Sequence, residues 1–123
     1  TDVTGFALLG HSYEMAQGSG CSIRLDTAKI PYHPEAYEMA EMGFIPAGAY
    51  RNREYAGPGV KTGPGVTRAV EDICYDPQTS GGLLMALPRE AAEACLAELR
   101  EAIPQAAVIG SVTDRREYAV YLD

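Results

Sequence analysis

Cysteine and histidine are scarce in this chain of 123 residues, and their spacing excludes the commonest structural metal site. The cysteines are Cys21, Cys74 and Cys95, with no CxxC pair among them, and neither histidine lies beside the other or beside a cysteine. A structural zinc ion normally needs four Cys or His ligands at paired spacings. We therefore expect no zinc site. Free thiols without a disulfide framework are typical of the cytosol, which predicts a cytoplasmic location.

Basic side chains and long apolar runs are also in short supply. Ten Lys and Arg stand against 17 Asp and Glu, so the net charge is −7. A nucleic-acid surface needs clustered Lys and Arg, so no nucleic-acid partner is expected. The longest apolar runs reach only about five residues, too few to span a bilayer. The chain shows no basic segment followed by an apolar one, which is the pattern of a secretory signal.

The length suits a single domain over residues 1–123, because domains commonly contain about 100–150 residues. Residue 1 is Thr rather than Met, and the most patterned segment of the chain begins there. We therefore expect the chain to be one domain of a longer protein.

Apolar spacing predicts three helices, over residues 4–17, 34–42 and 88–102. Asp2 or Thr4 could cap the first helix, and Pro34 suits the first turn of the second. Side chains expected on the core face of the third are Ala92, Cys95, Leu99, and Ala102 or Ile103, so Cys95 is expected to be buried and inert.

Strands are expected over 21–26, 83–87, 107–112 and 117–122, with 83–87 buried on both faces, and residues 69–75 fit either a strand or a helix. Such an order favours an α+β fold with a mixed sheet flanked by helices.

Residues 46–68 are rich in Gly and Pro and contain the near-repeat Gly57–Thr62 and Gly63–Arg68. This composition buries little apolar surface, so a mobile loop is expected. The repeat is not a phosphate-binding P-loop, because Val60 stands where that motif needs Gly before Lys.

Two segments carry candidate chemistry. In Thr1–His11, Asp2 precedes a predicted helix, where a carboxylate acts either as an N-cap or as a Mg²⁺ ligand. Local chemistry alone favours the cap. In Asp76–Leu84, Gly81 and Gly82 permit close backbone approach, so this loop is either a tight turn or a set of donors to an anion or partner surface.

These two segments, TDVTGFALLGH and DPQTSGGLL, closely resemble the C-terminal domain of selenophosphate synthetase (selenide, water dikinase). Residues 46–52 (PAGAYRN) and 108–112 (VIGSV) are similar as well, so the resemblance covers essentially the whole chain. It implies a three-layer α/β/α domain with partial ferredoxin-like topology, as in the related aminoimidazole ribonucleotide synthetases.

The resemblance also implies a function: an enzyme that makes selenophosphate, AMP and phosphate from selenide, ATP and water. Asp2 falls at the Mg²⁺ ligand of the family, which reverses the preference for a cap. An N-terminal domain would bind most of the ATP and Mg²⁺, carry the catalytic residues and form a homodimer. No catalytic residue is therefore expected in this chain. Residues expected to bind phosphate or to contact that domain are Thr4, Thr79, Ser80, Gly81 and Gly82.

Two other functions stay open: a domain of another enzyme of the same ATP-binding superfamily, or a stand-alone binding module without catalysis. The chain also departs from the family pattern TGFGLLGH, because Ala7 replaces a Gly. In a helix Ala should be the more favourable residue by roughly 1 kcal/mol. We expect His11 to make a structural polar contact and His33 to lie at the surface.

Overall fold

The computed structural model describes all residues from Thr1 to Asp123 and contains five helices and four strands. The helices are α1 (Ala7–Gly18), α2 (Pro34–Glu41), α3 (Ala47–Ala56), α4 (Arg68–Cys74) and α5 (Arg89–Ala102). The strands are β1 (Cys21–Leu25), β2 (Val60–Thr62), β3 (Gly110–Asp114) and β4 (Val120–Leu122). Two 3₁₀ turns, η1 (Thr27–Lys29) and η2 (Gly57–Gly59), complete the element order.

The four strands form one mixed sheet in the order β2-β4-β1-β3. β1 is antiparallel to β3 and parallel to β4, and β4 is parallel to β2. In this register Ile23 lies opposite both Val112 and Val120. Helices flank the sheet, which confirms the expected α+β fold.

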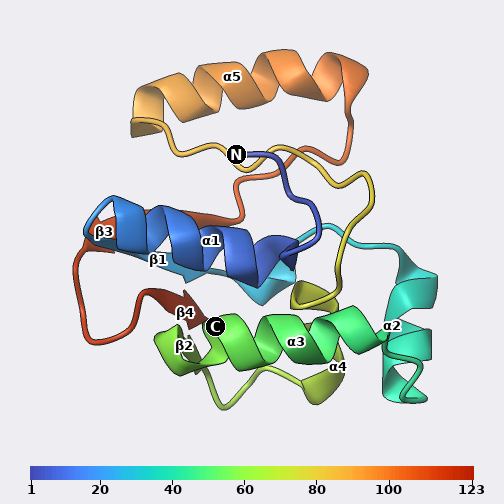
Figure 1. Ribbon diagram of the computed structural model, residues 1–123. Helices are drawn as coiled ribbons and strands as arrows, with labels where there is room; N and C mark the ends of the chain where they lie inside the picture. Colours follow the sequence, from blue (N-terminus) through green and yellow to red (C-terminus); the bar gives the residue numbers. More distant parts are fainter.

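The core lies between the sheet and α1, which packs against β1, β4 and α3 (Figure 1). Alternate residues of the central strands face this layer, because successive strand side chains point to opposite faces. Leu9, Leu25, Val120 and Leu122 are all almost fully buried there. By contrast, α5 buries no residue and stands apart from the other helices in Figure 1.

Several predicted elements are confirmed. The strand predicted over 21–26 is β1, which ends at Leu25. The helix predicted over 34–42 is α2, with Pro34 in its first turn, and the helix predicted over 88–102 is α5. Residues 69–75 are helical, which decides between the two alternatives for that segment. Gly20 has a φ of 62° just after α1, as expected for a glycine that follows a helix end.

The predicted cap of the first helix is wrong. α1 begins at Ala7, its N-cap residue is Phe6, and no side chain caps it. A turn precedes the helix instead, with the Ala7 amide donating to the Thr4 carbonyl over 2.9 Å. Asp2 therefore lies several residues before the helix, and its carboxylate is not used to cap it.

The prediction of a mobile loop over residues 46–68 is also wrong, because this segment contains α3, η2 and β2. Ala49 and Ala56 of α3 are buried in the core. Arg53 forms ion pairs with Glu71 at 2.7 Å and Asp72 at 2.6 Å. Burial of small alanines and paired charges offsets the ordering cost that the Gly/Pro composition suggested.

Residues 83–87 do not form the doubly buried strand that their apolar run predicted. Their only ladder contact is an isolated bridge between Leu83 and Asp2, and the Leu83 side chain is 73% exposed. β3 and β4 also begin later than predicted, at Gly110 and Val120. These two strands do not pair with each other, because β1 lies between them in the sheet.

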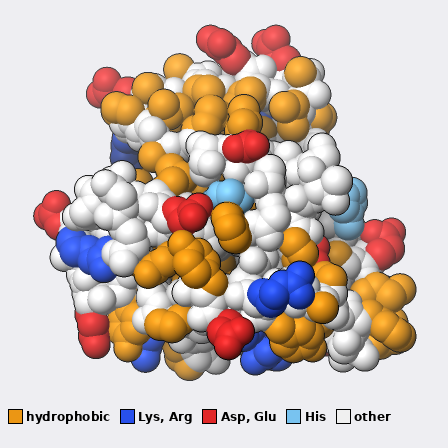
Figure 2. Space-filling view, viewed as in Figure 1, with side chains coloured by type: hydrophobic (Ala, Val, Ile, Leu, Met, Phe, Trp, Pro, Cys, Tyr) orange, Lys and Arg blue, Asp and Glu red, His pale blue; other side chains and the backbone are white.

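The core face predicted for α5 is buried only in part. Ala92, Cys95 and Leu99 are half-buried, whereas Ala102 and Ile103 are exposed. The expectation of a buried Cys95 is therefore wrong, because few groups pack against α5. In Figure 2 hydrophobic side chains line the side of α5 turned toward the rest of the molecule, while acidic side chains project outward.

Candidate functional site

The two segments singled out in the sequence lie side by side, joined through their main chains. The Val3 amide donates to the Gly82 carbonyl over 2.8 Å, and the Leu84 amide donates to the Thr1 carbonyl over 2.8 Å. The Gln78 amide donates to the Thr4 carbonyl over 3.0 Å. Residues 1–4 therefore form a short extended pair with residues 82–84, although about 80 positions separate them in sequence.

Gly81 allows the backbones of the two segments to approach each other closely. A Cβ added at Gly81 would lie 2.2 Å from the Val3 carbonyl oxygen, which no side chain can tolerate without displacement. Gly82 has open space around it, and its carbonyl accepts from Val3. The predicted close approach is therefore present at Gly81 but not at Gly82, and its partner is the segment that carries Asp2.

Asp2 is exposed at the centre of this extended pair, opposite Leu83. Its carboxylate takes part in none of the ion pairs of the chain. A free, exposed carboxylate is the kind of oxygen donor that Mg²⁺ accepts, so the residue fits a metal-ligand role. No group of three or more Asp, Glu, His or Cys that could hold a metal ion gathers in the chain, so no other side chain of this kind joins Asp2 in such a group.

Thr4 and His11 form a polar contact next to Asp2. The Thr4 hydroxyl lies 3.1 Å from His11 Nε2, and His11 Nδ1 lies 3.6 Å from a Glu14 carboxylate oxygen. The expected structural contact of His11 is therefore present, and it occupies the hydroxyl of Thr4. His33 is exposed at the N-cap of α2, as expected.

Thr79 and Ser80 lie at the exposed tip of the second segment, and their hydroxyls make no hydrogen bond within the chain. The base of the same loop is more ordered: Gln78 Nε2 donates to an Asp76 carboxylate oxygen over 2.8 Å. Burial raises the pKa of Asp76 above its usual range, and this hydrogen bond partly offsets the rise. The two exposed hydroxyls are free to donate to an external anion or surface.

Ala7 has a φ of 65°, the left-handed backbone region that strongly favours glycine. Its side chain is fully buried at the start of α1. The expectation that Ala favours the helix at this position is wrong, because the backbone there is not in the right-handed helical region. Ala7 lies within the first segment, five residues after Asp2, so the chain turns sharply between Asp2 and the rest of α1.

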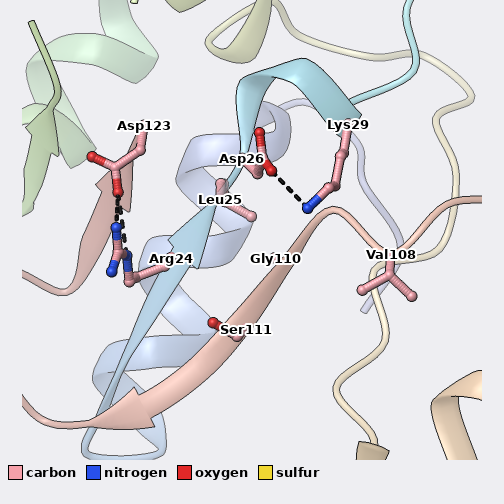
Figure 3. Close-up of a pocket in the computed structure, with 8 residues that line it drawn as sticks. All are labelled: Arg24, Leu25, Asp26, Lys29, Val108, Gly110, Ser111 and Asp123. Atoms are coloured by element: carbon pink, nitrogen blue, oxygen red, sulfur yellow. Dashed lines mark hydrogen bonds and ion pairs between the residues drawn. The ribbon is translucent and has the colours of Figure 1, made fainter. Parts of the chain in front are cut away.

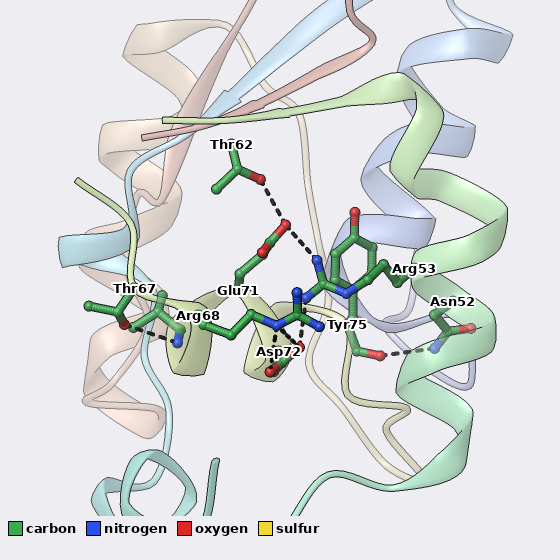
Figure 4. A network of polar contacts seen from close by, with 9 residues as sticks. Asn52, Arg53, Thr62, Thr67, Arg68, Glu71, Asp72 and Tyr75 are labelled. Carbon is green, nitrogen blue, oxygen red and sulfur yellow. Dashed lines mark hydrogen bonds and ion pairs between the residues drawn. The ribbon is translucent and has the colours of Figure 1, made fainter. Parts of the chain in front are cut away.

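A polar network below the site joins α3 to α4 (Figure 4). Arg53 contacts both Glu71 and Asp72, and its guanidinium lies 4.5 Å from the centre of the Tyr75 ring. Burial alone would lower the pKa of Arg53, but the two carboxylates outweigh it and raise that pKa. Burial raises the pKa of Tyr75 to about 12. All these charges are matched, so the network has a structural role.

Asn52 is the residue of this region that sequence reasoning missed. It is buried, and its Nδ2 donates to the Gly5 carbonyl over 2.9 Å and to the Tyr75 carbonyl over 3.1 Å. Its only signal in the sequence was membership of the PAGAYRN stretch.

A separate cavity of about 510 Å³ opens beside β1 and η1 (Figure 3). Arg24 pairs with Asp123 at 2.6 Å there, and Lys29 pairs with Asp26 at 2.8 Å. Its lining contains none of the predicted site residues. With both cations already paired, this cavity has no free charge to select a ligand, and the paired segments remain the candidate site.

Fold and site together define a mixed α+β domain in which two paired segments present one free carboxylate. Residues 1–123 match the family model described as "AIR synthase related protein, C-terminal domain". The chain belongs to this family. No helix in the structure is both long enough and apolar enough to cross a membrane.

The chain is similar to curated proteins named selenide, water dikinase. The chain is 49% identical to the selenide, water dikinase of Pelobacter propionicus, over 93% of its own length and 33% of that protein. It is 46% identical to the selenide, water dikinase of Treponema denticola, over 95% of the chain and 34% of that protein. The resemblance to selenophosphate synthetases is therefore confirmed, and the chain spans about a third of the length of these relatives.

Proposed function

We propose that the chain is the C-terminal domain of an ATP- and Mg²⁺-dependent selenide, water dikinase, which makes selenophosphate, AMP and phosphate from selenide, ATP and water. One observation carries this proposal: the TDVTGF segment pairs with the DPQTSGG segment and leaves the Asp2 carboxylate exposed and unpaired. The names of the relatives supply the reaction class.

In this proposal Asp2 supplies one oxygen ligand to Mg²⁺ on the ATP phosphates. The bound ion would neutralise negative charge that develops during phosphoryl transfer. Thr79 and Ser80 would donate their free hydroxyls to a phosphate or to the neighbouring domain. Thr4, Gly81 and Gly82 would act through the backbone, because they fix the position of the segment that carries Asp2.

The remaining parts of the site would come from outside the chain. We propose that an N-terminal ATP-binding domain supplies the other metal ligands and the catalytic residues, that the full-length enzyme is a homodimer, and that it acts in the cytoplasm. Mg²⁺ sites commonly use one or two protein carboxylates together with substrate phosphates and water. A lone Asp2 on this domain is consistent with such a shared site.

The test uses the full-length protein with ATP and selenide under anaerobic conditions, with AMP and selenophosphate followed by ³¹P NMR. We expect both products to form, and to disappear when EDTA removes Mg²⁺ and return when Mg²⁺ is restored. Turnover of ATP without any dependence on selenide would instead favour another enzyme of the same superfamily. Absence of ATP turnover would favour a binding module.

A further inference from the structure

We infer that Asn52 is a positioning residue that fixes the two paired segments relative to each other. It lies in α3, outside both segments, and touches each at its base. Gly5 follows Thr4 in the first segment, and Tyr75 immediately precedes Asp76 in the second. The amide group of Asn52 therefore donates hydrogen bonds to the main chain at both places. Its Nδ2 lies 2.9 Å from the Gly5 carbonyl oxygen and 3.1 Å from the Tyr75 carbonyl oxygen.

The two carbonyls that Asn52 contacts have no other partner in the main chain. Neither the Gly5 nor the Tyr75 carbonyl accepts a backbone hydrogen bond. Tyr75 is 1% exposed, so loss of the Asn52 donor would leave its carbonyl buried and unpaired. Such a group is costly in a protein interior. Both contacts require a donor, which identifies the NH₂ group of Asn52 as the group that faces them.

A second contact from the same helix supports this role. A Cβ added at Gly48 would lie 2.7 Å from Pro77 Cγ, so α3 packs directly against the second segment at its first turn. Gly48 and Asn52 are four residues apart and therefore share one face of α3. That face lies against the junction of the two segments, while Arg53, one residue on, turns toward Glu71 and Asp72 of α4 (Figure 4).

The consequence for chemistry rests on the proposed function. Asn52 touches no substrate in this account, and the Asp2 carboxylate makes no contact that could fix its own position. Its placement depends on the backbone pairs Val3–Gly82 and Thr4–Gln78. Asn52 holds the two paired segments in a fixed position relative to each other. Its loss should therefore weaken Mg²⁺ binding.

The first readout is independent of metal and of activity. Hydrogen exchange is measured by mass spectrometry on the metal-free full-length protein, for wild type, Asn52→Leu and Asn52→Asp. Leu keeps a similar volume without a donor, and Asp places an acceptor against two carbonyls. We expect exchange at least about tenfold faster in peptides covering residues 1–6 and 76–84, with β1 unchanged. Ala56→Gly, which weakens α3 without touching either carbonyl, should leave both peptides as in wild type.

The second readout is the Mg²⁺ concentration that gives half-maximal selenide-dependent AMP formation. We expect it to rise about tenfold in Asn52→Leu, and to stay at the wild-type value in Ala56→Gly. Unchanged exchange in both segments of the two Asn52 variants would overturn the inference. An inactive wild-type protein would overturn the proposed function alone, because the exchange measurement would still report on Asn52.

A third measurement needs no variant and so survives any failure to fold. In wild-type protein, NMR exchange rates of the Asn52 side-chain NH₂ protons should be far slower than those of Gln17, whose amide bonds only an exposed tyrosine hydroxyl. Equal exchange rates for the two side chains would contradict the positioning role of Asn52.

Discussion

At the scale of single residues, the backbone restricts which side chains two positions near the site can carry. Gly81 is required because the Val3 carbonyl occupies the space of a Cβ. Ala7 occupies a left-handed position that costs a residue with a Cβ roughly 1–2 kcal/mol. Ala7 lies in the same segment as Asp2, and strained backbone is commonly found beside functional sites.

Substitution of Ala7 by Gly should therefore leave stability almost unchanged. Relief of the left-handed strain offsets the lost buried methyl and the added freedom of the unfolded chain, so we expect a free energy of unfolding within about 0.5 kcal/mol of wild type. Ala16 is the matched control, since it is also fully buried in α1 but lacks a positive φ. Ala16→Gly should cost about 2 kcal/mol. Equal losses in urea denaturation would contradict the strain at Ala7.

Cys74 should be the least reactive thiol of the native chain. It is buried, and burial raises its pKa to about 12, so almost no thiolate is present near neutral pH. Cys21 and Cys95 are half-exposed. Iodoacetamide labelling at pH 8, followed by peptide mass spectrometry, should modify those two first and Cys74 only on unfolding. Early modification of Cys74 in the folded protein would contradict its burial.

At the scale of elements, α3 connects the site to the rest of the fold. One of its faces contacts the paired segments through Gly48 and Asn52, and Arg53 joins it to α4. Asp72 is also held by Arg68 at 3.0 Å, so two cations share one buried carboxylate. These ion pairs hold α3, which carries Asn52, against α4.

Arg53→Ala should cost about 2 kcal/mol of stability, because it removes the only ion pair of Glu71 and one of two at Asp72 in a partly buried setting. The control is Arg24→Ala, whose ion pair with Asp123 is about half exposed. Exposed pairs contribute less than about 1 kcal/mol. The two free energies of unfolding, measured by urea denaturation, should differ clearly. Similar values would show that the α3–α4 network contributes little.

Elements with a strong local pattern could be predicted from the sequence, and those that depend on distant partners could not. α1, α2 and α5 follow from apolar spacing and from the prolines and glycines at their ends. α3 was hidden, because the Gly and Pro residues around it dominated the composition of 46–68. Leu83–Leu87 has the composition of a strand, yet strand formation also requires a neighbouring edge, and only Leu83 finds one.

The candidate site follows the same division. Asp2 and the Gly81–Gly82 turn stood out by their residue types, and the structure brings their segments together. Asn52 did not stand out, because both of its partners are main-chain carbonyls, 47 and 23 positions away. A side chain that recognises backbone leaves no paired residue in the sequence to reveal it.

At the scale of the whole molecule, the chain forms a helix-flanked mixed sheet with one free carboxylate at the paired segments and a net charge of −7. It spans about a third of its selenide, water dikinase relatives. In the proposed function such a domain would offer Mg·ATP one ligand, the Asp2 carboxylate. Activity would therefore depend on Asp2 acting together with groups of the N-terminal domain proposed above.

The central claim is tested most directly by AMP formation from ATP and selenide in the full-length protein carrying Asp2→Asn. Asn keeps the shape and the exposed position but removes the charge, so we expect at least about a hundredfold loss of activity with thermal stability unchanged. Asp114→Asn, an exposed carboxylate at the end of β3, should retain wild-type activity. Wild-type activity in Asp2→Asn would contradict a metal-binding role for Asp2 and, with it, the site proposed here.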